Sequence, residues 1–214
     1  VFAQHRGGQR IPVEVTVAPI FDQNEKVVGG IEVFRDLTEM MSDLRKARVI
    51  QDHSLGGDLP GDPRLQFAVR YSPAEVVGGD FYRLESLGSD RYAVLVADVM
   101  GHGIASALYT MQLRALWDDG REWLATPGSF LAELNRRLSR LVDADGYFAT
   151  GVMVVVDAAS GELRLVGAGH AAPLLVSAGG GVRSIGGRSP ALGLVQEATY
   201  AETVEHLGPG ETLL

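Results

Sequence analysis

The sequence predicts an α+β fold in which strands and helices are segregated along the chain. Three observations support this prediction: alternating strand patterns come first, two helical patterns follow, and a second run of strand patterns comes last. Elements arranged in this order build antiparallel sheets that are covered by helices. A regular alternation of strand and helix, which a parallel sheet would need, is not present.

The composition is that of a globular protein with a real hydrophobic core. Of the 214 residues, 46% are hydrophobic and 21% are charged, which bounds the chain at one or two domains and excludes disorder for most of it. The net charge of −8 argues against non-specific nucleic-acid binding, which needs clustered basic residues. Cysteine is absent, so a cysteine nucleophile is excluded and a reducing, cytoplasmic compartment is favoured. No apolar run reaches the roughly 18 residues of a membrane-spanning segment.

The first region is expected to form an antiparallel hairpin followed by a helix. Residues 10–20 alternate apolar and polar side chains, and residues 27–34 alternate again after a polar turn at 22–25. Between residues 37 and 51 the apolar positions recur every three or four residues, which predicts a helix. The glycines and the proline of 56–61 end that helix, so we place a domain boundary there.

Two further strands and two helices are expected beyond the boundary. Residues 65–71 and 92–99 have strand patterns, and residues 104–117 have a helical one. The apolar face of this helix is expected to carry Leu108, Met111 and Ala115. The second helix, over residues 130–141, is expected to be capped by Ser129. Its apolar stripe consists of Phe130, Leu131, Leu134, Leu138 and Leu141.

The last region is expected to be a strand meander. Residues 147–157 and 162–168 form one hairpin, and residues 173–177 and 182–185 form another around three glycines.

Two acidic residues stand out from the other carboxylates. Asp80 follows a pair of glycines, and Asp98 ends the apolar strand pattern. An ionised Asp at the end of a buried strand is costly unless something compensates its charge, and a hard divalent cation does so with carboxylate ligands. The alternative is that Asp98 caps the following turn while Asp80 sits in a glycine turn. Spacing alone leaves both interpretations open.

Four segments occur in this order along the chain: VGGDFY at 77–82, VADVMGHG at 96–103, FAT at 148–150 and AGHAAP at 168–173. Together they resemble the ordered motifs of the stage-II-sporulation-protein-E-type phosphatases, which belong to the PPM superfamily of metal-dependent phosphatases. SPALG at 189–193 and LGPGE at 207–211 extend the resemblance, which runs from about residue 58 to residue 214.

This resemblance implies a β-sandwich flanked by helices, with two Mg²⁺ or Mn²⁺ ions in a cleft at one end of the sheets. It assigns Asp80 to one metal, Asp98 to both metals as the bridging ligand, and the backbone carbonyl of Val99 as a further ligand. The paired cations would acidify a water that attacks phosphorus in line, without a phosphoenzyme. His102 and His170 lie in the motifs and are candidates for binding substrate; the alternative is that each hydrogen-bonds its own loop. Thr150 is expected to shape the sheet.

The chain departs from the family in one respect. Relatives carry another metal-binding Asp, in a Thr-Asp-Gly motif just after the segment that corresponds to 207–214, and a further acid later. We therefore expect the phosphatase domain to be truncated at its C-terminus, and expect this piece to be nearly inactive while the longer protein is active.

The stretch from Gly7 to Glu39 resembles the last strands of a PAS sensor domain. Asp36-Leu37-Thr38 matches the passage into the signalling helix of such domains. The expected organisation is a partial PAS domain over 1–38, a linker helix over 39–57 and the phosphatase domain over 58–214. The helix is either a solvated linker or a dimerising element that positions the metal loops.

The function implied by these resemblances is PAS-controlled dephosphorylation of phosphoserine or phosphothreonine on a bacterial regulatory protein, such as an anti-sigma-factor antagonist. The alternative is a pseudophosphatase that acts as a regulated dimerisation module. A nucleotide-binding ATPase is excluded because the chain has no phosphate-binding P-loop.

Overall fold

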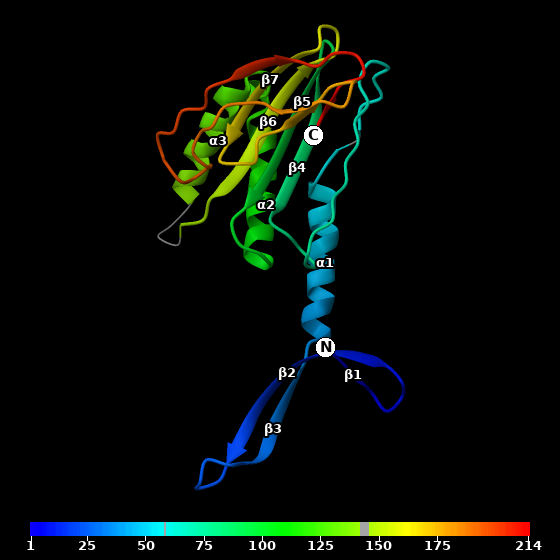
Figure 1. Ribbon diagram of the computed structural model, residues 1–214, viewed down its shortest axis with the longest axis vertical. Coiled ribbons are helices and arrows are strands. Elements are labelled where there is room, and N and C mark those ends of the chain that lie inside the picture. The colour runs from blue at the N-terminus through cyan, green and yellow to red at the C-terminus, as the bar shows by residue number, and fades with distance from the viewer. Residues whose placement is uncertain (58, 142–145) are drawn as a thin grey trace. The chain divides into compact units, whose positions relative to one another are not determined.

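The computed structural model describes residues 1–57, 59–141 and 146–214, and the chain divides into two compact units, Val1–Val49 and Ile50–Leu214 (Figure 1). Asp58, with which the expected phosphatase domain begins, and the side chain of Leu141 lie outside what is described. The helices of the described residues all fall short of the length and apolarity that a bilayer crossing requires.

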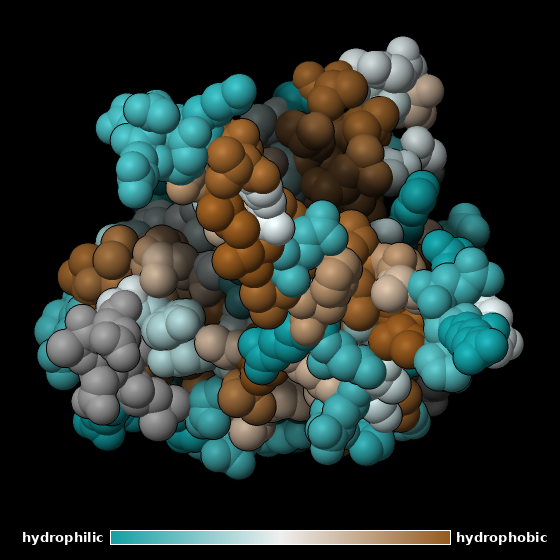
Figure 2. Space-filling model, turned by 90° about the horizontal axis from the view of Figure 1, so that it is seen from below, coloured by the Kyte–Doolittle hydropathy of each residue, from teal (hydrophilic) through white to brown (hydrophobic). Residues whose placement is uncertain are grey.

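The first unit is a three-stranded antiparallel sheet in the order β1-β2-β3. Its strands are β1 (Phe2–Gln4), β2 (Arg10–Phe21) and β3 (Val27–Asp36), so the expected hairpin is confirmed. The hairpin turn forms because the Asp22 carboxylate accepts hydrogen bonds from the backbone N–H groups of Asn24 and Lys26. Many apolar side chains of this sheet are exposed. Figure 2 shows hydrophobic residues lying among hydrophilic ones on the surface that it views.

Helix α1 (Thr38–Ser54) follows directly. It begins where the N–H of Thr38 donates to the side chain of Asp36, at 2.8 Å. It ends before Gly56, whose φ of 73° lies in the left-handed region that glycine adopts without strain. The helix therefore runs three residues beyond the helical pattern of 37–51 and ends three residues before the expected end of the linker helix at residue 57. Its last turn belongs to the second unit.

The second unit is built on a five-stranded antiparallel sheet in the order β10-β7-β6-β5-β4. The strands are β4 (Asp80–Gly88), β5 (Arg91–Val99), β6 (Ala149–Asp157), β7 (Glu162–Ala168) and β10 (Thr203–His206). A smaller sheet has the order β11-β8-β9 and consists of β8 (Leu174–Val176), β9 (Val182–Ser184) and β11 (Thr212–Leu213). Both hairpins expected after residue 147 are confirmed.

The helices of this unit are α2 (Ile104–Asp119), the short 3₁₀ helix η1 (Arg121–Trp123) and α3 (Pro127–Leu141). Figure 1 shows α2 and α3 running along strands β4 to β7. Between these helices and the large sheet lies the helix-side cluster, which includes Phe81, Leu95, Leu113, Trp117, Leu131 and Met153.

The opposite face of the sheet carries a second core. This sheet-side cluster includes Leu84, Val152, Val154, Leu163, Leu165, Leu175 and Ile185, and so joins the large sheet to the small one. Strand β6 faces both clusters, which explains why its residues 152–156 are apolar without alternation. The expected sandwich of sheets with flanking helices is confirmed.

Two expectations about local structure in the second unit are wrong. Residues 65–71 form no strand, because Leu65 and Phe67 pack against the sheet-side cluster without joining a hydrogen-bonded ladder. Ser129 does not cap α3, because the helix already begins at Pro127, where the missing N–H of proline costs nothing.

The buried face of α2 also differs from the expected one. Leu108 is 65% exposed, whereas Thr110, Leu113 and Trp117 are buried. The helix has two apolar stripes, and the one that carries the large Trp117 ring faces the sheet, where the ring packs edge-on against Phe130. The expected stripe of α3 is confirmed for its four members whose burial is described.

Candidate metal centre

Three strands bring a row of polar side chains to one end of the large sheet. Asp80, the first residue of β4, lies directly opposite Asp98 near the end of β5, and Asp98 lies opposite Thr150 of β6. Directly opposed residues of antiparallel strands point to the same face. By the strand alternation, these three share the face of Val152 and the sheet-side cluster. Asp80 and Asp98 are both exposed to solvent, so an ion can reach them.

His170 joins this row from the segment after β7. Its Nδ1 atom lies 2.7 Å from the Thr150 hydroxyl oxygen. The preceding Gly169 has a φ of 66°, and a Cβ atom there would meet Ala191 at 2.9 Å, so only glycine fits this turn. The structure thus brings together Asp80, Asp98 and His170, and it adds Thr150, which sequence analysis gave only a structural role.

The two carboxylates of the row, those of Asp80 and Asp98, repel each other. Burial raises the pKa of the Asp80 carboxyl above its ordinary value, the neighbouring Asp98 charge raises it further, and His170 partly offsets both effects. The surrounding atoms therefore desolvate the carboxylate although the residue as a whole is exposed. Two adjacent carboxylates with this mutual repulsion favour a bound cation.

We expect the metal-free protein to lose stability as pH rises through the Asp80 titration. The folded state holds the Asp80 proton at pH values where the unfolded chain, with its ordinary pKa of 3.8, has released it. The folded state therefore binds more protons in this window, and the free energy of unfolding falls as pH increases. Thermal melting in a chelator between pH 4 and pH 7 measures this, with Asp80→Asn as the matched variant. An Asp80→Asn protein with the same pH slope as the unmodified one would contradict the prediction.

The loop that leads into Asp80, which contains Gly78 and Gly79 and is called the Asp80 loop below, is packed tightly against the end of β5. The N–H of Val99 donates to the carbonyl of Gly79 at 3.0 Å. A Cβ atom on Gly79 would lie 2.7 Å from the Val99 carbonyl oxygen and 3.1 Å from Cβ of Ser106. The absence of a side chain at Gly79 therefore lets the Asp80 loop and the Val99 carbonyl approach each other. The Val99 side chain is buried on the helix side.

His102 lies outside the row. Its side chain is 86% exposed, and its Nδ1 atom is 3.1 Å from a carboxylate oxygen of Glu75. The neighbouring Gly101 and Gly103 both have positive φ angles, so this loop turns sharply before α2. Sequence analysis missed Glu75, because its proximity to His102 is a tertiary contact between segments 27 residues apart.

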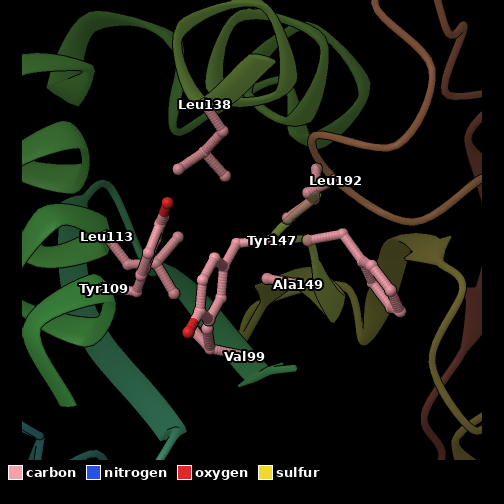
Figure 3. Close-up of a pocket in the computed structure, with 8 residues that line it drawn as sticks. Val99, Tyr109, Leu113, Leu138, Tyr147, Ala149 and Leu192 are labelled. Atoms are coloured by element: carbon pink, nitrogen blue, oxygen red, sulfur yellow. The ribbon is translucent and has the colours of Figure 1, made fainter. Parts of the chain in front are cut away.

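A small apolar pocket lies on the helix side of the large sheet, on the opposite face from the row of polar side chains (Figure 3). Val99, Leu138 and Leu192 line it, and Tyr109 stacks on Tyr147 with ring centroids 4.9 Å apart. Neither Asp80 nor Asp98 lines this pocket. It is therefore a packing feature beside the site and not the place where the carboxylates act.

The donors of the row fit a hard divalent cation. Carboxylate oxygens are the preferred ligands of Mg²⁺, which is commonly held by one or two carboxylates while waters and substrate phosphate fill its other positions. Among the described residues no group of three or more His, Cys, Asp or Glu side chains is arranged to hold a metal. Asp80 and Asp98 would therefore hold a cation with incomplete protein ligation.

Comparison with known protein families identifies two regions. The model of the family "Stage II sporulation protein E (SpoIIE)" matches residues 88–214, and a PAS domain model matches residues 1–39. The phosphatases of the PPM superfamily are metal-dependent.

Individual relatives agree with these matches. The phosphoserine phosphatase RsbP of Bacillus subtilis is 29% identical over 176 residues, which cover 80% of this chain and 43% of RsbP. The phosphoserine phosphatase RsbU of the same organism is 25% identical over 193 residues, covering 90% of this chain and 56% of RsbU. The chain thus spans about half the length of these relatives. The solved SiaA-PP2C domain of Pseudomonas aeruginosa is 27% identical with a TM-score of 0.69, covering 82% of this chain and 70% of that one.

Proposed function

The chain belongs to the stage II sporulation protein E family, and on that premise we propose that it hydrolyses phosphoserine or phosphothreonine on a regulatory protein. The observation that carries the proposal is the in-register pairing of Asp80 with Asp98. Both residues occupy motif positions of the family, and two relatives are named phosphoserine phosphatases.

Asp80 and Asp98 would hold two Mn²⁺ or Mg²⁺ ions, with Asp98 shared between them and the Val99 carbonyl as an additional ligand. When bound, such a metal pair supplies acidity for a water nucleophile and positive charge for the phosphate. Gly79 contributes by letting the Asp80 loop approach the Val99 carbonyl.

His170 is suited to bind the substrate phosphate or to protonate the serine oxygen that leaves. If the Thr150 hydroxyl donates to Nδ1, the ring proton is on Nε2, which can then donate to an oxygen of the substrate. His102, beside Glu75 on an exposed loop, is suited to contact the phosphorylated protein.

The proposed substrate is a phosphorylated protein of the anti-sigma-factor antagonist type, in the cytoplasm. Support comes from the similarity to RsbP and RsbU and from the PAS match at residues 1–39. In this proposal residues 1–38 form part of the sensor, residues 39–57 form the signalling helix, and residues 58–214 carry the metal site. Exposed apolar side chains on α1, such as Met40 and Val49, support pairing of two copies through this helix.

A direct test is phosphate release from a phosphoserine-containing antagonist protein. Because this piece alone is expected to be nearly inactive, the assay uses a longer protein that includes this chain. We expect that protein to turn over in Mn²⁺ or Mg²⁺ and to lose turnover after chelation, because the carboxylate pair has no other means of activating water. The same assay with His170→Ala and His102→Ala is expected to raise KM about tenfold, the effect of one lost hydrogen bond to a charged group. Turnover that persists in excess chelator would contradict the proposal.

A catalytically inactive dimerisation module is the second candidate. It is favoured by the absence of a third metal-binding side chain beside Asp80 and Asp98 among the described residues. Antagonist binding by the longer protein without any phosphate release, at saturating metal, would identify this alternative.

A further inference from the structure

The side chain of Gln51 is a buried amide in the last turn of α1. It is 2% exposed, and its amide nitrogen donates to the Gly78 carbonyl at 2.7 Å and to the Thr110 hydroxyl at 3.0 Å. Its amide oxygen accepts the N–H of Gly78 at 3.1 Å. One side chain therefore binds both backbone groups of the same glycine.

This pairing occurs where the sheet provides no neighbouring strand. Gly78 lies two residues before Asp80, just ahead of β4, and β4 is the edge strand of the large sheet. Backbone N–H and C=O groups that leave water need a partner. The Gln51 amide has the same donor and acceptor pair as a peptide group, so it substitutes for an adjacent strand at this point.

The end of α1 that carries Gln51 belongs to the second unit and is held there by further contacts. Arg114 of α2 donates to the carbonyl of Ser54 at 3.1 Å, and Arg83 of β4 donates to the carbonyl of Gly56. Leu55 is buried in the helix-side cluster. These contacts hold the last turn of α1 in place, so Gln51 can serve as a rigid support for the loop.

The Asp80 loop is thus held from two sides. Val99 holds Gly79 from the side of β5, and Gln51 holds Gly78 from the side of α1 and α2. We propose that Gln51 is a positioning residue for the metal centre, which sets the Asp80 carboxylate opposite Asp98 by clamping the backbone of Gly78. The effect on metal binding rests on the proposed function, which supplies the cation. The hydrogen bonds between Gln51 and Gly78 do not depend on that proposal.

The first arm of the test measures the loop without metal. Gln51→Met keeps the length of the side chain and removes its hydrogen bonds. We expect the amides of residues 76–82 to exchange with solvent at least about tenfold faster in the Gln51→Met protein, because opening of this segment no longer breaks the clamp. Exchange that is unchanged in residues 76–82 would overturn the proposal, whatever the protein binds.

Asn135 provides a matched control. It is also a buried amide, 1% exposed, and it clamps a different loop by donating to the carbonyls of Val195 and Gln196 and accepting the N–H of Gly193. Asn135→Leu is expected to speed exchange in residues 193–196 and to leave residues 76–82 unchanged. Faster exchange at residues 76–82 in the Asn135→Leu protein would mean that removing a buried amide side chain elsewhere also destabilises the Asp80 loop. That result would overturn the proposal as well.

The second arm measures Mn²⁺ binding by calorimetry. We expect the apparent dissociation constant to rise about tenfold in Gln51→Met, as for partners that orient a metal ligand, and to stay within about twofold in Asn135→Leu. In active protein, kcat at saturating Mn²⁺ should approach the unmodified value, since the ligands themselves remain. Faster exchange with unchanged Mn²⁺ affinity would overturn the positioning role.

Two outcomes separate this inference from the proposed function. If a longer protein that includes this chain binds no Mn²⁺, the proposed function fails, and the exchange arm alone decides whether Gln51 clamps the loop. If Gln51→Met does not fold, Thr110→Val removes one of the three hydrogen bonds, and it is expected to give the same pattern with an effect of about threefold on exchange.

Discussion

Replacing Asp98 with Asn is expected to reduce metal-dependent phosphate release by at least about 100-fold in a longer protein that includes this chain. Asp98 is proposed as a direct metal ligand, and the loss of a direct ligand should cost more than the roughly 10–100-fold that follows the loss of a supporting group. The substitution keeps the shape of the side chain and removes the charge that the two metal positions would share. In the metal-free protein it also removes the repulsion that raises the pKa of Asp80. The metal-free variant should therefore be as stable as the unmodified protein or slightly more stable.

This combination of lost turnover and retained stability distinguishes a ligand from a structural residue. The measurements are phosphate release in Mn²⁺ and thermal melting in chelator. Asp119→Asn is a suitable control, since Asp119 is an exposed carboxylate at the end of α2. A variant at Asp98 that turns over at the unmodified rate would rule out the metal assignment.

Gly79→Ala is expected to damage both the fold and the site. The added Cβ atom would lie 2.7 Å from a backbone oxygen, that of Val99, which cannot move aside as a flexible side chain can. Overpacking of this kind costs about 1–3 kcal/mol of unfolding free energy. Because the loop must shift to relieve the contact, Asp80 should move away from Asp98, and Mn²⁺ affinity should fall with stability.

Urea unfolding and Mn²⁺ calorimetry measure these two effects. Gly179→Ala is the control, because a Cβ atom on Gly179 would meet nothing within 4 Å. Gly79 does not have a positive φ angle, so any effect comes from the close approach and not from backbone preference. If Gly79→Ala were as stable as Gly179→Ala, the tight packing of the loop would be disproved.

The two carboxylates could be predicted from the sequence, but their register could not. Asp98 ends a clear apolar strand pattern, whereas the sequence of β4 has no such pattern because Arg83 and Glu85 interrupt its apolar residues. Those residues are accommodated by tertiary contacts: Glu85 accepts a hydrogen bond from the indole of Trp117, and Arg83 donates to the carbonyl of Gly56. Local patterns contain no information about such partners, and the same limit explains the false strand at 65–71.

The supporting groups of the site were also beyond prediction from local sequence. Thr150 lies in a recognised motif, but its contact with His170 depends on how β6 and the segment after β7 come together. Gln51 is a polar residue at the end of the predicted helix pattern, and nothing in that pattern distinguishes it from solvent-facing residues. Its burial arises only when the last turn of α1 meets Gly78 and Thr110.

The double-faced packing of β6 has a thermodynamic consequence for the second unit. Met153 and Val155 contribute to the helix-side cluster, while Val152, Val154 and Val156 contribute to the sheet-side cluster. Unfolding of either the helices or the small sheet would remove packing contacts from these five residues of β6. The helical layer and the small sheet are therefore coupled into one cooperative unfolding event, and the strand that bears Thr150 stays ordered until the whole unit is lost.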